Sequence, residues 1–196
     1  MSRPETKASS YGGAEHDGPV HEGGLSGNGK RFAIVAARFN DFIVEKLIDG
    51  ARAALRRAGV EQEDIELYRC PGAMEIPGLA RKVADTSKFD GIVCLGAVIR
   101  GATPHFDLVV REAASGVGAL AAEGKIAVAF GVLACDNIEQ AVERAGAKAG
   151  NRGADAAMVA VEMADLYAHI EAEKKAEAAV PVSVVPAPPT DLPRRK

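Results

Sequence analysis

The 196-residue sequence contains no tryptophan and only 5% aromatic residues. Acidic and basic residues nearly balance, which gives a formal net charge of −3. This charge provides no basic patch for nucleic acid or for an anionic membrane surface. No apolar run approaches the ~20 residues of a membrane span, and no apolar stretch follows a basic start. We therefore expect a cytoplasmic protein that binds neither nucleic acid nor membranes.

Cysteine is also scarce, and its spacing argues against metal or disulfide chemistry. Cys70, Cys94 and Cys135 form an odd set without a C-x-x-C pair, and each lies in or beside an apolar run. They are predicted to be small buried side chains in a reducing compartment. His16 and His21 have no companion ligands nearby and are predicted to be solvated. No metal site is expected.

The composition that remains is typical of a globular protein, with 47% hydrophobic and 26% charged residues. Residues 1–30 are rich in Gly, Ser, Glu and Asp and lack periodicity, which predicts a flexible N-terminal arm. Residues 176–196 are rich in Ala, Val and Pro, with five prolines, and are predicted to form a disordered tail. The domain should therefore occupy residues 31–175.

Four short apolar runs within this domain have the length of strands, and each precedes a helical pattern. The runs are 32–37, 65–68, 91–99 and 126–133, and the helices are expected at about 41–58, 75–85, 104–123, 137–145 and 151–175. Continuous rather than alternating apolar runs indicate strands that are covered on both faces. The pattern predicts an α/β fold, a three-layer αβα sandwich around a four-stranded parallel sheet of the flavodoxin-like type.

The turn after the third run is the most distinctive stretch. Thr103 is a plausible N-cap, and Pro104 suits the first position of a helix. The free N–H groups of that helix would make the turn a candidate phosphate site. His105 lies at its rim, and an imidazole can transfer protons near neutral pH. The alternative is an ordinary strand-to-helix turn with a solvent-facing histidine.

Other distinctive side chains follow the remaining strands, and ligands of parallel sheets bind beyond these strand ends. Phe39 could stack on a flat ring or could cap the core. Glu75 could accept hydrogen bonds from a ligand, or it could be a solvated carboxylate at a helix start. Arg144 could bind an anion or could form a surface ion pair with Glu143. Together these residues predict an enzyme acting on a phosphate-bearing, ring-containing small molecule.

The sequence resembles the lumazine synthase family over about residues 32–168. The matching stretches occur in the family's order. They are 38–40 (RFN), 71–77 (PGAMEIP), 95–107 (LGAVIRGATPHFD), 130–133 (FGVL), 139–141 (EQA), 144–146 (RAG) and 148–153 (KAGNRG).

The resemblance implies a transferase of riboflavin biosynthesis at its penultimate step. This enzyme condenses 5-amino-6-(D-ribitylamino)uracil with 3,4-dihydroxy-2-butanone 4-phosphate to 6,7-dimethyl-8-ribityllumazine, phosphate and water. It implies no metal and no organic cofactor. The residues expected to bind the pyrimidine are Phe39, Ala73, Met74, Glu75, Ala97, Val98, Ile99 and Phe130.

For the butanone phosphate, the resemblance implies binding by Ala102, Thr103 and Arg144, with His105 as the catalytic proton relay. Phe130 and Arg144 would reach the site from an adjacent subunit. Met74 departs from a frequent phenylalanine of the family, which could alter contacts with the ribityl chain.

The family also implies a homo-oligomer of pentamers, and riboflavin synthase is a candidate partner. The compact 148–153 link resembles that of shell-forming members, so we predict a 60-subunit icosahedral shell. The alternative functions are a non-catalytic shell or flavin-binding protein on the same fold, and a flavodoxin-like electron carrier. Retention of Phe39, Glu75, His105 and Arg144 argues against loss of catalysis, and bound flavin would colour an electron carrier.

Overall fold

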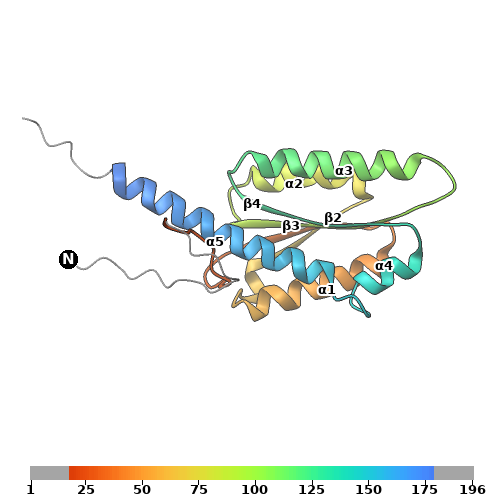
Figure 1. Cartoon of the computed structure of the whole chain (residues 1–196), viewed down its shortest axis with the longest axis horizontal. Helices are drawn as coiled ribbons and strands as arrows, with labels where there is room; N and C mark the ends of the chain where they lie inside the picture. The colour runs from red at the N-terminus through yellow and green to blue at the C-terminus, as the bar shows by residue number, and fades with distance from the viewer. Residues whose placement is uncertain (1–17, 179–196) are drawn as a thin grey trace, which may run out of the picture.

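A computed structural model describes residues 18–178 of the chain and contains one four-stranded parallel sheet (Figure 1). The strands are β1 (Phe32–Ala37), β2 (Ile65–Cys70), β3 (Gly91–Ile99) and β4 (Ala127–Cys135), in the order β2-β1-β3-β4. The predicted parallel sheet is confirmed. The bounds of β1 and β3 match those expected, whereas β2 and β4 each extend two residues further at their carboxyl ends.

Helices cover both faces of the sheet. On one face lie α2 (Ile76–Ala84) and α3 (His105–Ala122) (Figure 1). On the other face lie α1 (Asp41–Arg57), α4 (Ile138–Arg144) and α5 (Arg152–Ala178). Two short 3₁₀ turns, η1 (Gln62–Asp64) and η2 (Ala73–Glu75), precede β2 and α2. The three-layer αβα prediction is therefore confirmed.

The sheet separates two hydrophobic cores. Ile34 and Leu95 face α1 and α5, whereas Val35 and Ile92 face α2 and α3, and all four side chains are fully buried. Successive strand residues point to opposite faces, so burial on both faces requires an uninterrupted apolar run. Each such side chain contributes about 1.5–3 kcal/mol by its removal from water.

The predicted N-cap Thr103 is wrong, and Asn40, which stands at the N-cap position of α1, does not cap that helix with its side chain. Asn40 precedes α1 but adopts a left-handed backbone (φ 60°), and its side-chain Nδ2 donates to the Ala97 carbonyl at 2.9 Å instead of capping the helix. The helix α3 begins at His105, one residue later than predicted. Pro104 occupies the N-cap position, and among the described residues no side chain, Thr103 included, caps the first turn of α3.

The N-terminal segment also differs from the expected flexible arm. Lys30 Nζ lies 2.8 Å from Asp165 Oδ1 on α5, and the Gly24 backbone N–H donates to Asp165 Oδ2 at 2.8 Å. A Cβ added at Gly23 would lie 2.0 Å from the Glu162 carbonyl oxygen, so only glycine fits this approach. Gly23, Gly24 and Lys30 are therefore in contact with α5. The tail predicted from residue 176 is wrong for its first three residues, which belong to α5. Residues 1–17 and 179–196 lie outside the described residues.

Cys70, Cys94 and Cys135 are buried free thiols, as predicted. Burial raises the pKa of the Cys94 thiol to about 12, because the surroundings disfavour the thiolate. His21 is exposed, as predicted, and His16 lies outside the described residues. In the part of the chain from 18 to 178, no helix combines the length and apolarity that crossing a membrane requires.

Candidate functional site

The strand order creates a crevice between β1 and β3, because the connections that leave these two strands run to opposite sides of the sheet. From β1 the chain crosses to β2 on one side, and it then returns past β1 to β3 on the other. In open parallel sheets, ligands bind outside the carboxyl ends of the strands at such a switch point. The turns after β1, β2 and β3 meet at this edge.

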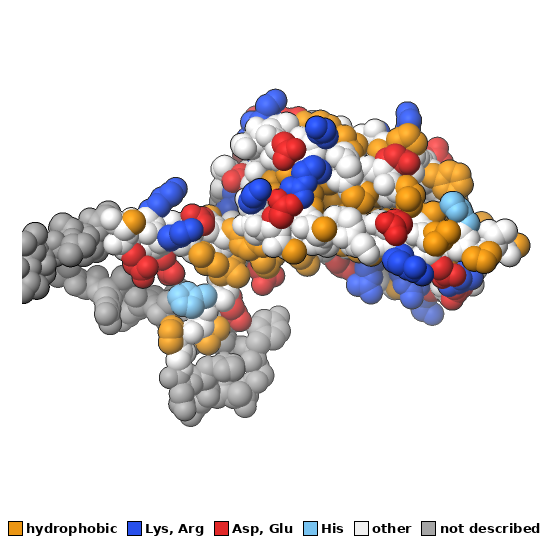
Figure 2. Space-filling view, turned by 90° about the horizontal axis from the view of Figure 1, so that it is seen from above, with side chains coloured by type: hydrophobic (Ala, Val, Ile, Leu, Met, Phe, Trp, Pro, Cys, Tyr) orange, Lys and Arg blue, Asp and Glu red, His pale blue; other side chains and the backbone are white. Residues whose placement is uncertain are grey.

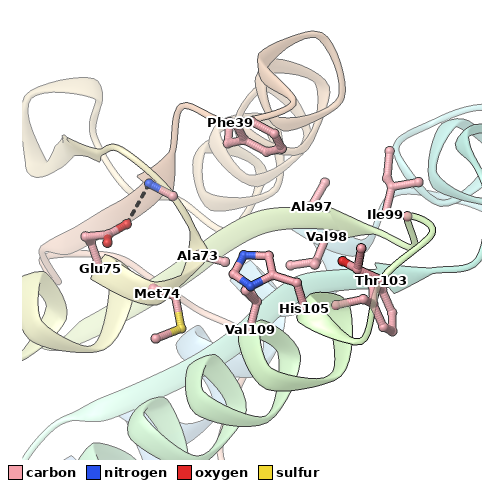
Figure 3. A pocket seen from close by; sticks show the side chains of 13 residues that line it. Phe39, Ala73, Met74, Glu75, Ala97, Val98, Ile99, Thr103, His105 and Val109 are labelled. Atoms are coloured by element: carbon pink, nitrogen blue, oxygen red, sulfur yellow. Dashed lines mark hydrogen bonds between the residues drawn. The ribbon is translucent and has the colours of Figure 1, made fainter.

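A pocket of about 370 Å³ lies there (Figure 3). Its walls come from four segments: the β1–α1 turn, the 3₁₀ turn η2, the end of β3, and the β3–α3 turn with the start of α3. The lining residues are Phe39, Gly72, Ala73, Met74, Glu75, Ala97, Val98, Ile99, Gly101, Thr103, His105, Phe106 and Val109. We call this the switch-point pocket.

Phe39 forms the aromatic wall of this pocket, and its side chain is 71% exposed (Figure 3). The alternative of an aromatic cap on the core is therefore wrong. The backbone N–H of Phe39 donates to the Pro71 carbonyl, and Asn40 donates to the Ala97 carbonyl. These two hydrogen bonds attach the β1–α1 turn, which contains Phe39, to the ends of β2 and β3. The phenyl ring is therefore held in an exposed position at the pocket.

Glu75 is the last residue of η2, and its side chain contacts the backbone just before this turn. Its Oε2 accepts a hydrogen bond from the Gly72 N–H at 2.9 Å (Figure 3). This bond leaves Oε1 free for another donor among the described residues. Ala73 is buried in the wall, while Met74 is half exposed at the lip. Nearby, burial and the charge of Glu75 raise the pKa of the Cys70 thiol, so Cys70 stays protonated at the pocket margin.

The turn from β3 to α3 supplies Gly101, Thr103 and His105 to the pocket. The His105 ring projects between Val98 and Met74 toward the pocket centre (Figure 3). Because no described side chain caps α3, its first N–H groups remain available to an anion at this end of the pocket. Ala102 lies in the same exposed turn between two lining residues, without lining the pocket itself.

Phe130 and Arg144 lie elsewhere, in a second cavity of about 350 Å³ along the outer edge of β4. Arg144 Nη1 donates to the Gln140 carbonyl at 3.1 Å, and within residues 18–178 it forms no ion pair with Glu143 or another carboxylate. Arg152 also lines this cavity and pairs with Asp155 at 3.1 Å. Phe130 is 44% exposed. We call this the β4-edge cavity.

Comparison with known proteins shows the family of the chain. The family model described as 6,7-dimethyl-8-ribityllumazine synthase matches residues 29–168. The chain belongs to the 6,7-dimethyl-8-ribityllumazine synthase family. The matched range contains every residue of both cavities.

Bacterial relatives of this name are similar over nearly their whole length. The protein of Chlorobium phaeovibrioides is 54% identical over 146 residues, which is 74% of this chain and 94% of the relative. The protein of Syntrophus aciditrophicus is 53% identical over 151 residues, 77% of this chain and 98% of the relative. That of Chlorobium luteolum is 54% identical over 146 residues.

Sequence reasoning missed several residues that the structure places at these cavities. Gly72, Gly101, Phe106 and Val109 line the switch-point pocket. The two glycines follow strands and could have been found by that position, but nothing in the apolar pattern distinguishes Phe106 and Val109 from core residues. Within residues 18–178, no group of three His, Cys, Asp or Glu side chains is placed to hold a metal ion.

Proposed function

We propose that this chain catalyses the condensation of 5-amino-6-(D-ribitylamino)uracil with 3,4-dihydroxy-2-butanone 4-phosphate, a transferase reaction of riboflavin biosynthesis. The product is 6,7-dimethyl-8-ribityllumazine, with release of phosphate and water. The single observation that carries the proposal is the switch-point pocket, which brings Phe39, Glu75 and His105 together in a chain of the lumazine synthase family.

Different parts of the pocket would contact the ring face, the ring N–H groups and the ribityl chain of the pyrimidine. Phe39 would stack on the ring, since its face is exposed and its turn is held by hydrogen bonds. Glu75 would accept a hydrogen bond from a ring N–H through its free oxygen. The wall of Ala73, Met74, Ala97, Val98 and Ile99, with Phe130 from another subunit, would contact the rest of the pyrimidine and its ribityl chain.

The proposed chemistry needs proton transfer and removal of an anion. The pyrimidine amine attacks the ketone and loses water to form an imine, and phosphate then leaves by elimination. The ribityl-substituted nitrogen attacks the remaining carbonyl, and loss of a second water closes the ring. His105 is placed in the pocket to move protons in these steps. Holding both substrates in one pocket also makes the first step effectively unimolecular, which is a large part of the expected acceleration.

We further propose that the phosphate binds at the β3–α3 turn through Ala102 and Thr103, with Arg144 supplied by an adjacent copy. The uncapped start of α3 supports an anion there. A guanidinium would add a charge-assisted, two-pronged contact. Within one chain Arg144 lines the other cavity, so its participation requires two copies in contact.

The proposed assembly is a shell of twelve pentamers, which riboflavin synthase could occupy as a partner. Its support is the tight link before α5, where Asn151 Nδ2 donates to the carbonyls of Ala145 and Lys46 and the Gly146 N–H donates to Gly150. Light scattering of the purified protein should show a particle of about sixty chains. A particle of only about five chains would refute the shell and leave the pentamer.

We propose a reducing, cytoplasmic location. Its support is that all three cysteines of the chain are free thiols, each buried in a strand of the sheet. Fluorescence microscopy of the tagged full chain in its own cell type would test the location.

The proposed activity is tested by mixing purified protein with both substrates and following lumazine absorbance and fluorescence. Product should form faster than in the protein-free mixture, and His105→Ala should remove most of the acceleration. No acceleration by a well-folded oligomer would reject the enzyme in favour of the non-catalytic shell. Flavin absorbance in the purified protein would favour the electron carrier.

A further inference from the structure

Arg100 directly follows β3, and its side chain contacts two carboxylates. Nε lies 2.9 Å from Asp136 Oδ1 in the β4–α4 turn. Nη1 lies 3.3 Å from both carboxylate oxygens of Asp107 in the first turn of α3. The guanidinium carbon is also 4.0 Å from the centre of the Phe106 ring. One side chain therefore joins the first turn of α3 to the β4–α4 turn.

The backbone of Arg100 reinforces this arrangement, since its N–H donates to the Cys135 carbonyl at 2.9 Å. The paired carboxylates stabilise the charged guanidinium, and the hydrogen bond with Asp136 raises the pKa of Arg100 further. Its donors are thus directed at Asp107 and Asp136. Arg100 does not line the pocket, so it is not itself placed to bind the phosphate.

Asp107 and Asp136 would otherwise place negative charge beside the proposed phosphate site. Asp107 lies in the first turn of α3, whose N–H groups face the anion. A carboxylate at this helix start would repel a phosphate dianion bound to the same turn. On the face seen in Figure 2, Lys, Arg, Asp and Glu side chains are interspersed, so no broad positive patch offsets such local repulsion.

We propose that Arg100 is a positioning and neutralising residue for the phosphate-bearing substrate: it holds the β3–α3 turn and cancels the charges of Asp107 and Asp136 beside the anion. This inference rests on the proposed function, because it concerns the phosphate of that reaction. It distinguishes Arg100 from Arg144, which would contact the phosphate directly.

The decisive experiment is steady-state kinetics of the full-length Arg100→Gln variant with each substrate varied in turn. The KM for the butanone phosphate should rise about threefold to tenfold, while kcat and the KM for the pyrimidine stay within about twofold. The rise should shrink as ionic strength increases, because salt screens the uncovered carboxylates. An unchanged KM for the butanone phosphate would overturn the proposal.

Adding Asp107→Asn to Arg100→Gln separates neutralisation from structural damage. Removing the charge of Asp107 should reverse at least half of the rise in the KM for the butanone phosphate, measured on a logarithmic scale. No recovery, with both substrates affected alike and no salt dependence, would mean a merely structural role. Arg56→Gln is the matched control: it removes the same charge from the last turn of α1, at the opposite edge of the sheet, and should change nothing.

If Arg100→Gln fails to assemble by light scattering, Arg100→Lys replaces it. The lysine keeps the positive charge, so its KM for the butanone phosphate should stay within about twofold, and a larger rise would overturn the neutralising role. An inactive wild type would reject the proposed function instead. In that case, binding of inorganic phosphate, measured by phosphorus NMR, should be weaker in Arg100→Gln, and equal binding would overturn this inference.

Discussion

The switch-point pocket and the β4-edge cavity have nearly the same volume, about 370 and 350 Å³, but they are built differently. The first is formed by the ends of three neighbouring strands and holds an aromatic ring, a carboxylate and an imidazole. The second lies along an edge strand and holds the Phe130 ring and two guanidiniums, one of them paired with Asp155, but within residues 18–178 no histidine lines it. Neither contains all the groups that a phosphate-releasing condensation uses. The difference suggests that each is half of a site completed between copies of the chain.

The largest effect should come from the imidazole of the switch-point pocket. His105→Ala removes the proton relay but leaves the exposed start of α3 intact, so kcat should fall by roughly 10²-fold or somewhat less. Steady-state kinetics with both substrates saturating measures this effect, and circular dichroism checks the fold. Unchanged turnover would remove His105 from the mechanism.

Changing the β4-edge cavity should affect binding rather than turnover. Arg144→Ala should raise the KM for the butanone phosphate by about tenfold, the size expected for a lost charge-assisted hydrogen bond. Varying each substrate at saturating levels of the other measures it. Arg152→Ala in the same cavity is a useful comparison, because Arg152 is already paired with Asp155. An effect confined to the pyrimidine would contradict the role of Arg144.

Co-expressing the two variants tests whether the cavities are halves of one site. If each site takes His105 from one copy and Arg144 from its neighbour, random mixing makes about a quarter of the sites fully wild-type. The mixture should then exceed the mean activity of the two separate variants at low butanone phosphate. Activity equal to that mean would place both residues in one chain's site.

Phe39 should matter less, because stacking contributes only about 0.5–1.5 kcal/mol. Phe39→Ala should raise the KM for the pyrimidine about fivefold, the equivalent of about 1 kcal/mol, with little change for the butanone phosphate. Thermal stability should stay the same, since the ring is 71% exposed and supports no core. Phe39→Tyr keeps the stacking face and is the matched control. Equal loss of affinity for both substrates would argue against stacking.

The smallest effect should come from a site far from both cavities, where Asp165 binds Lys30 and Gly24. These contacts lower the pKa of Asp165, so its ionised form stabilises the fold. Asp165→Asn should cost about 1 kcal/mol at pH 7. The difference from wild type should persist above about pH 4 and close as pH falls through the lowered pKa. Melting curves between pH 7 and 3 would show this, with activity at pH 7 unchanged.

The sequence allowed the sheet to be predicted because burial on both faces leaves an uninterrupted apolar run, as in β1 and β3. It did not predict the last residues of β2, since Arg69 is polar and β2 is an edge strand with partly exposed side chains. The contact of Lys30 with Asp165 spans 135 residues and has no local signal. Such long-range contacts depend on the assembled fold.

Much of the candidate site could be predicted for a related reason. Parallel strands end at one edge, so Phe39, Glu75 and His105 had to lie near one another. The caps could not be predicted, because Asn40 can either cap a helix or donate to a neighbouring strand, and only the position of Ala97 decides. The separation of Phe130 and Arg144 from the pocket also depends on β4 being the edge strand, which sequence order alone does not specify.

Helix α5 has one further consequence. Its last buried residue is Ala164, but the helix continues to Ala178 and leaves the sheet at the edge opposite the pocket (Figure 1). At 1.5 Å per residue the portion beyond Tyr167, which still packs against the core, is about 16 Å long. It acts as a rigid stalk, so a label or carrier attached at Ala178 would stand clear of both cavities and could report on assembly without obstructing substrate entry.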